Sequence, residues 1–184
     1  MNLRYCFPKT DTFIQTVLQI DREVYPASLQ GSFQSVSARF HANQDSYVCV
    51  CDGEELCGYL CLFPISEALH NSMLGTKGYF DDNITPDEIV PFSRNTHLFI
   101  ISVAIRPAYQ DTDVVRVLTE GFRRYLSDKV QRGYEIRTLS CYTVSEGGER
   151  WAKRMGLHRH HGLPNGDQFY WAEQDMLGEI MYGT

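Results

Sequence analysis

A ten-residue apolar stretch in the middle of the chain, Thr96 to Ile105, constrains the fold more than any other feature. It reads THLFIISVAI, which is too short for a typical long helix, and Arg106-Pro107 ends it. From Asp113 onward, apolar residues recur every three or four positions until Gly133, which predicts a long amphipathic helix. A buried strand followed by this helix favours an α/β fold.

Periodicity and turn residues divide the remainder of the chain into short elements. The clearest is a hairpin, because Asp52-Gly53 separates two runs that are rich in β-forming residues. The other helices are expected after a cap at Thr10 or Asp11, over residues 32–43, and from Ser145-Glu146 to Gly156. The expected strands besides the central one are residues 3–7, 47–51, 56–63, 136–144, 157–161 and 168–172.

Between Pro64 and Asn95 the strand character lapses, which predicts a long insertion. It combines apolar anchors with an acidic cluster that includes Asp81 and Asp82, and Thr85-Pro86 is a possible helix start. Loops longer than about 12 to 15 residues are usually functional or disordered. We expect this one to be ordered by packing of its apolar anchors.

Length and composition indicate one globular domain. The chain has 184 residues, of which 43% are apolar and 22% charged, close to the averages of globular proteins. No apolar run is long enough to cross a bilayer, and the first residues do not read as a secretory signal. We therefore expect a cytoplasmic protein without membrane partners.

The charged and metal-binding residue types exclude several function classes. Lys and Arg total 17 against 23 Asp and Glu, with no basic run that would neutralise nucleic-acid phosphates. The six cysteines form no paired C-x-x-C motif, so we interpret them as structural thiols. His160 and His161 are adjacent, so their rings should point to opposite faces of a strand, which disfavours a shared metal. We expect neither a nucleic-acid partner nor a metal.

Two patches resemble the GNAT superfamily of acyl-CoA N-acyltransferases. The first patch is SVAIRPAYQDTDVVRVLTEGF, which is similar to the family's cofactor motif. That motif is a central strand and a V-x-P step, followed by Q/R-x-x-G-x-G/A at a helix start. Ile105-x-Pro107 and Gln110 align with it. SEGGERWAKRMGL is similar to the family's N-x-x-A-x-x-x-Y-x-x-x-G-F helix, with Gly156 and Leu157 aligned. The resemblance implies one GNAT-like domain over residues 1–184. Its mixed central sheet would have helices on both faces and the insertion, residues 64–95, between the third and fourth strands.

The resemblance also implies a site for acetyl-CoA or coenzyme A. Main-chain groups of the central strand would bind the pantetheine arm, and the loop with the following helix start would face the pyrophosphate. Asp113 and Val115 stand where the family has its two loop glycines, and Asp111 adds a second carboxylate. Asp111 or Asp113 could alternatively be an ordinary helix cap, because a carboxylate suits the first turn of a helix. The implied cofactor-binding residues are Ser102, Val103, Ala104, Ile105, Tyr109, Gln110, Asp111, Thr112, Asp113, Val114, Val115 and Ser145.

The catalytic positions of the family are substituted in this chain. The base position on the central strand is Phe99 and the tyrosine position is Ala152, and neither titrates. Substitutes are available in His97, which shares a strand face with Phe99, and in two tyrosines of later strands. The candidate catalytic residues are His97, Tyr142 and Tyr170, with surface, capping or sheet-packing roles as the alternative.

The resemblance leaves the acceptor open as a small-molecule or peptide amine. Glu23 and Tyr25, where the family lines its acceptor pocket, are candidates for binding an ammonium group, as are Asp81 and Asp82. The implied activity is transfer of an acetyl or related short acyl group from coenzyme A to an amine. The alternative is a non-catalytic module of the same fold that senses a ligand or binds a protein. A cysteine hydrolase built on Cys141 lacks any supporting nucleophile spacing.

Overall fold

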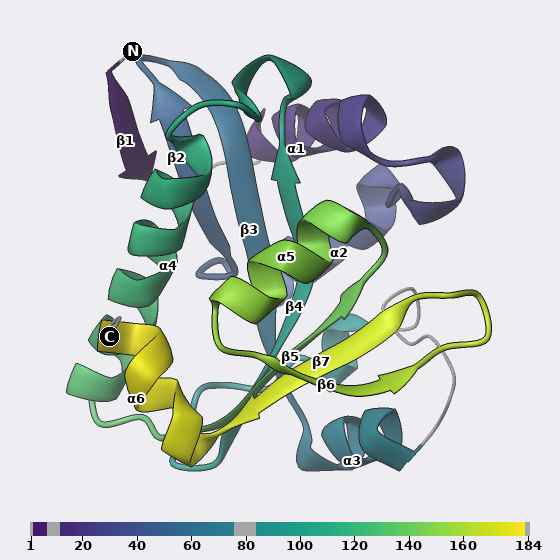
Figure 1. Cartoon of the computed structure of the whole chain (residues 1–184), viewed down its shortest axis with the longest axis vertical. Coiled ribbons are helices and arrows are strands. Elements are labelled where there is room, and N and C mark those ends of the chain that lie inside the picture. Colours follow the sequence, from purple (N-terminus) through teal and green to yellow (C-terminus); the bar gives the residue numbers. More distant parts are fainter. Residues whose placement is uncertain (1, 7–11, 76–83, 183–184) are drawn as a thin grey trace. The chain divides into compact units, whose positions relative to one another are not determined.

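The computed structural model describes residues 2–6, 12–75 and 84–182, and its elements carry the labels of Figure 1. Seven strands hydrogen-bond in the order β1-β2-β3-β4-β5-β7-β6. The sheet is mixed, because β4 and β5 run parallel while the β1-β2, β2-β3, β5-β7 and β6-β7 pairs are antiparallel. The predicted α/β fold with a mixed sheet is therefore confirmed. Within those residue ranges, no helix is long and apolar enough to cross a membrane.

The chain divides into two compact units, so the predicted organisation as one domain stays a prediction. The first unit is Met1–Cys61 with Ser102–Tyr125, and the second is Leu62–Ile101 with Leu126–Thr184. Three elements run through both units: β3 (Glu55–Ile65), β4 (Thr96–Ile105) and α4 (Val114–Gln131). The other elements of the first unit are β1 (Leu3–Cys6), α1 (Thr12–Val24), η1 (Ala27–Leu29), α2 (Phe33–Ala42), β2 (Tyr47–Asp52) and η4 (Pro107–Tyr109).

The first unit is built around an aromatic cluster that α1, α2 and the β2-β3 hairpin supply. Tyr47 lies against Phe13, Phe40 and Tyr59, with ring centroids 5.1, 6.0 and 5.7 Å apart. Tilted and edge-on aromatic pairs at such distances add to the free energy gained by burial. Gly53, with φ +60°, makes the turn between β2 and β3, so the predicted hairpin is confirmed.

The second unit contains the remaining helices and strands. They are α3 (Glu67–Gly75), η3 (Pro86–Glu88), β5 (Ile136–Thr143), α5 (Glu146–Arg154), β6 (His158–Gly162), β7 (Gln168–Glu173) and α6 (Gln174–Tyr182). The sequence patterns missed α3 and α6. Both helices are short, so each offers only about two turns of periodicity, which is too little to distinguish a helix from a loop.

The insertion between β3 and β4 is confirmed, although it begins later than predicted. β3 continues through Pro64 to Ile65, which bridges to Ile89. Pro64 has no N–H to donate, but its carbonyl oxygen accepts from Val90 N at 2.9 Å. Among the predicted apolar anchors, Ile65, Leu69 and Ile84 are buried, whereas Ile89 and Phe92 are half-buried.

β4 extends beyond its pairing with β5. The parallel register runs from Thr96 opposite Ile136 to Ile100 opposite Cys141. β4 continues for five more residues, 101–105, and its end at Ile105 agrees with the prediction. The last part of the strand therefore has an edge that β5 does not pair.

Two stacked histidines are buried in the second unit. The rings of His70 on α3 and His97 on β4 lie 4.5 Å apart and nearly parallel, and His97 Nδ1 is 2.9 Å from the Thr138 hydroxyl. Burial, then the charges of His97 and His160, lowers the pKa of His70 to about 4. Burial also lowers the pKa of His97. The charge of Glu67 opposes this shift, and the charge of Arg137 adds to it. Both rings are therefore neutral at neutral pH.

Acid should destabilise the protein through this pair. An unfolded histidine has a pKa of about 6.5, whereas that of folded His70 is about 4. Between these values the unfolded chain binds more protons, so the free energy of unfolding falls as the pH falls through this window. We expect His70 to account for a loss on the order of 1–3 kcal/mol at pH 4, measured by urea unfolding at pH 7.5 and 4.

The matched variants are His70→Phe, which keeps a ring in the stack, and His158→Gln, which removes an exposed histidine. His70→Phe should flatten the pH dependence and His158→Gln should not. Equal acid sensitivity in wild type and His70→Phe would contradict this role for the pair.

Candidate functional site

The end of β4 presents main-chain groups on alternate sides. Arg106 N donates to Cys57 O at 2.9 Å, and Gly58 lies directly opposite Ile105. Because backbone groups alternate along a strand, Val103 and Ile105 turn their N–H and C=O groups away from β3. A Cβ on Gly58 would come within 2.9 Å of Ala104 O, so glycine is required for this close approach.

Side chains of the first unit reach the carbonyls on this outer edge. The Tyr25 hydroxyl donates to Val103 O at 2.9 Å, and Gln110 Nε2 donates to Ile105 O at 3.2 Å. Two acceptors of the predicted pantetheine channel are thus in contact with side chains of the same unit. A carbonyl oxygen has two lone pairs, so each acceptor can still take a second donor.

A buried polar network connects α1 to β4. The Tyr59 hydroxyl donates to Asp21 Oδ1 and lies 3.0 Å from Ser102 Oγ, which is 3.1 Å from the Tyr25 hydroxyl. Asp21 and Tyr59 are buried, whereas Ser102 and Tyr25 are half-buried. The network therefore runs from a buried carboxylate to the half-exposed end of β4.

Burial dominates the electrostatics of this network. It raises the pKa of Asp21, an effect that the hydrogen bond from Tyr59 and the charge of Arg39 oppose. It also raises the pKa of Tyr59, and that of Tyr25 to about 12. At neutral pH both tyrosines are protonated donors, and Asp21 is a more basic carboxylate than an exposed aspartate.

The predicted acceptor-binding residues Glu23 and Tyr25 have partners within the first unit. Arg106 Nη1 lies 2.5 Å from Glu23 Oε1, and Arg106 Nε donates to Leu56 O at 2.9 Å. Tyr25 is bound to Ser102 and Val103 as described above. Glu23 is thus neutralised by an arginine, and Tyr25 belongs to the β4 network. Asp81 and Asp82 lie outside the described residues.

The predicted loop and helix start are present. A 3-10 turn, η4, leads into α4 at Val114, and the Thr112 hydroxyl accepts from Val114 N at 3.4 Å. Asp113 accepts from the Arg116 guanidinium at 3.3 and 3.2 Å, which lowers the pKa of its carboxyl.

The turn before the helix has a contact of its own. The Tyr109 hydroxyl donates to Glu55 at 3.0 Å, a bond that raises the pKa of Tyr109 to about 12. Asp111 is exposed beside them.

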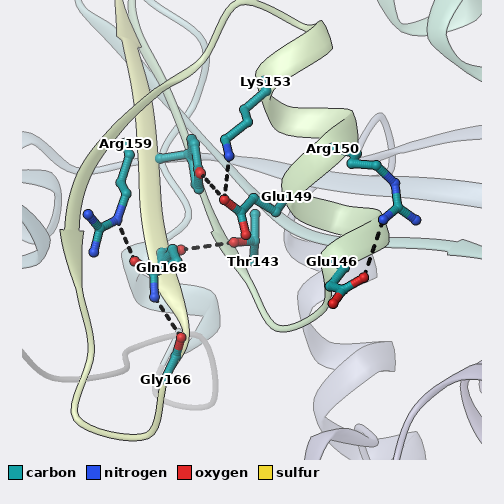
Figure 2. Close-up of polar contacts among 9 residues, drawn as sticks. Thr143, Glu146, Glu149, Arg150, Lys153, Arg159, Gly166 and Gln168 are labelled. Carbon is teal, nitrogen blue, oxygen red and sulfur yellow. Dashed lines mark hydrogen bonds and ion pairs between the residues drawn. The ribbon is translucent and has the colours of Figure 1, made fainter.

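The second unit has an open hollow of about 730 Å³ lined by residues of α5, β6 and β7. One lining residue is Glu149, whose Oε1 lies 2.5 Å from Lys153 Nζ and accepts from the Tyr170 hydroxyl at 2.9 Å; Figure 2 shows the contact with Lys153. The hydrogen bonds from Lys153 and, to a smaller extent, from Tyr170 lower the pKa of Glu149. Burial and, to a smaller extent, the hydrogen bond to Glu149 raise the pKa of Tyr170. The predicted residue Ser145 caps α5, accepting from Gly148 N at 3.1 Å.

The other predicted catalytic residues of the second unit are packed among rings. Tyr142 is half-buried between Phe99 and Phe169, with centroids 5.8 and 5.0 Å away. His97 belongs to the buried histidine pair, and its Nε2 has no hydrogen-bond partner among the described residues. A catalytic role for either stays a prediction.

The prediction that His160 and His161 point apart is wrong. Their Nδ1 atoms are 2.7 Å apart and their ring centroids 5.0 Å. The register between β6 and β7 shifts between Arg159 and His161, and such a bulge breaks the alternation of side chains. Over the described ranges, no three His, Cys, Asp or Glu side chains are grouped to hold a metal ion.

Three polar residues of these sites were missed from the sequence. Asp21 follows Val17 by four positions on the buried face of α1, so a carboxylate at a core position was the available signal. Tyr59 carries no distinguishing pattern within its strand. Glu149 precedes Lys153 by four positions, which reads equally as a surface ion pair.

Solved structures share this fold at low sequence identity. The loading GNATL domain of CurA from Lyngbya majuscula matches with a TM-score of 0.66 and 13% identity, over 94% of this chain and 98% of that chain. The ribosomal-protein-S18-alanine N-acetyltransferase from Escherichia coli matches with a TM-score of 0.59 and 12% identity, over 98% and 99%. The GphF GNAT-like decarboxylase, in complex with isobutyryl-CoA, matches with a TM-score of 0.64 and 9% identity, over 95% and 100%.

The sequence itself matches no family model and no curated protein. Matches at such low sequence identity are evidence for a shared fold but not for a shared activity. These matches extend over 94–98% of this chain, so the chain has the fold of the GNAT acyl-CoA N-acyltransferases.

Proposed function

We propose that the protein is an N-acyltransferase that moves an acetyl or related short acyl group from coenzyme A to an amine. The observation that carries the proposal is the unpaired edge of β4, where the main-chain groups of Val103 and Ile105 turn away from β3. An extended ligand arm with amide groups can bind such an edge as an added strand would. Pantetheine has this chemistry.

The residues of the first unit fit coenzyme A in part. Val103 and Ile105 would bind the pantetheine amides, and the first turn of α4 would face the pyrophosphate with its N–H groups and its positive dipole end. Asp111 and Asp113 bring negative charge to the same loop, although Arg116 offsets part of it. The bound thioester would supply the acyl group.

We assign removal of the amine proton to the network of Asp21, Tyr59 and Ser102. Ser102 is half-buried on β4, and the hydroxyl of Tyr59 links it to the carboxylate of Asp21. Hydroxyl groups can pass a proton along such a chain because each both donates and accepts. The raised pKa of Asp21 makes it a better base than an exposed aspartate.

A catalytic role for Tyr170, in the second unit, stays a prediction, as it does for His97 and Tyr142. The Tyr170 hydroxyl donates to Glu149 Oε1 at 2.9 Å. The acceptor would be a small-molecule or peptide amine.

The alternative is a non-catalytic GNAT-fold module that senses a ligand or binds a protein. The observation that favours it is the state of the cofactor elements: both glycine positions are substituted, and Tyr25 and Gln110 contact the β4 carbonyls. An enzyme of this class must bind its acyl donor. Binding of coenzyme A and acetyl-CoA therefore separates the two functions.

Removing the Asp21 carboxylate should slow catalysis without weakening cofactor binding. Asp21→Asn is expected to lower kcat by roughly 10²–10⁴-fold, the usual contribution of a general base, while the KM for acetyl-CoA stays constant. The acid limb of kcat/KM against pH, set by the raised pKa of Asp21 in wild type, should disappear. The assay follows coenzyme A release from acetyl-CoA with a panel of amines that includes a diamine and a peptide with a free α-amino group.

The matched control is Asp128→Asn, which removes an exposed aspartate paired with Arg132 and should leave activity unchanged. Tyr59→Phe should give a loss that resembles Asp21→Asn. Retention of both the rate and the acid limb in Asp21→Asn would exclude Asp21 as the proton acceptor.

Restoring glycine at the helix start should tighten binding of coenzyme A. Asp113→Gly with Val115→Gly removes one carboxylate and lets a phosphate approach the first turn of α4. A charge near a helix end contributes about 0.3–1 kcal/mol, so we expect a dissociation constant roughly two- to fivefold lower by calorimetry.

Glu120→Gln is the control, because Glu120 is bound to the same Arg116 but lies farther along α4. Its dissociation constant should equal that of wild type. An unchanged or weaker affinity in the glycine variant would show that this loop does not limit cofactor binding.

A further inference from the structure

Three cysteines gather where β1 pairs with β2 in the first unit. Cys6 lies opposite Cys49 in the antiparallel register, and Cys51 lies opposite Arg4, two positions farther along β2. The sulfur atoms of Cys6 and Cys51 are 2.8 Å apart. Cys6 and Cys51 are half-buried, whereas Cys49 is buried. Two of the three thiols therefore touch each other and reach solvent.

The surroundings of the three thiols differ in a way that separates their roles. Hydrogen bonds from Cys49 and Cys51 and the charge of Arg4 lower the pKa of Cys6 to about 6, against the effect of burial. Burial raises the pKa of Cys51 to about 12, and raises that of Cys49 as well. The lowered pKa favours the thiolate form of Cys6, and the raised pKa of each neighbour favours its thiol form.

We propose that Cys6 and Cys51 form a peroxide-sensitive thiol pair that closes to an intramolecular disulfide. A reactive thiolate that is partly exposed and has a second thiol in contact is the arrangement of known redox-sensing cysteines. This role differs from acyl transfer and does not depend on it.

The chemistry needs hydrogen peroxide as the oxidant and balances in two steps. The Cys6 thiolate attacks one peroxide oxygen, the O–O bond breaks, and the leaving hydroxide takes a proton to become water, which leaves a sulfenic acid on Cys6. The Cys51 sulfur then attacks the sulfenic sulfur, and its proton leaves with the sulfenic hydroxyl as a second water. The two thiols lose two electrons in total, and peroxide gains them. A thiol reductant reverses the disulfide.

The remaining cysteines are poor competitors. Cys57, Cys61 and Cys141 are buried, and burial raises the pKa of each. Cys49 contacts Cys6 but is shielded from solvent. The disulfide would join β1 covalently to β2, and a cross-link that closes such a long loop of chain stabilises the folded state.

The test is oxidation of the folded protein by hydrogen peroxide, followed by thiol counting and peptide mapping. Free thiols should fall from six to four, with the mapped link between Cys6 and Cys51. The rate of loss should be half-maximal near the Cys6 pKa of about 6. The oxidised protein should melt several degrees higher, and a reductant should restore all six thiols.

Cys6→Ser and Cys51→Ser should each prevent the loss of two thiols, while Cys141→Ala, at a buried site of the second unit, should behave as wild type apart from its missing thiol. Melting curves of the reduced variants establish that each is folded. The proposal is overturned if wild type keeps six thiols, if the link maps to Cys49, if oxidised chains join only between molecules, or if Cys6→Ser still loses two thiols.

Discussion

The close pairing of β3 with the end of β4 is the constraint on which the candidate site depends. Gly58 lets the two strands approach opposite Ile105, and the bond from Arg106 N to Cys57 O fixes which backbone groups face inward. The alternation of the strand then forces Val103 and Ile105 outward. Since the pairing with β5 ends at Ile100, these outward groups form an edge that a ligand can extend.

The polar network beneath this edge follows from the same geometry. Ser102 turns its side chain towards the hydroxyls of Tyr59 and Tyr25, and Tyr59 in turn satisfies the buried Asp21. A buried carboxylate without such a partner would cost several kcal/mol. The hydrogen bonds therefore keep a titratable group inside the first unit, where burial raises its pKa and makes it useful as a base.

The sequence predicted the fold well because the signals that define it are local. The apolar run Thr96–Ile105, the Asp52-Gly53 turn and the periodicity of α4 each correspond to an observed element. The helices α3 and α6 were missed because each is too short to show a period. The bulge that brings His160 and His161 together has no sequence signature of its own.

Much less of the candidate site was predictable. The resemblance located the loop before α4 and the end of β4, but the contacts of Asp21 with Tyr59 and of Glu149 with Tyr170 join residues 38 and 21 positions apart. Spacing along the chain does not predict such pairs, because tertiary packing alone brings them together. Glu23 looked free to bind an amine for the same reason, since its partner Arg106 is 83 positions away.

The most direct measurement of the central claim is a calorimetric titration of the wild type and Val103→Pro with coenzyme A. Proline at position 103 removes one N–H from the outer edge of β4 and leaves the groups that face β3 intact, as prolines at strand edges do. Saturable binding by wild type, lost or at least tenfold weaker in a folded Val103→Pro, is the predicted result. Failure of the wild type to bind coenzyme A, or equal binding by both proteins, would contradict the claim that this edge is a cofactor site.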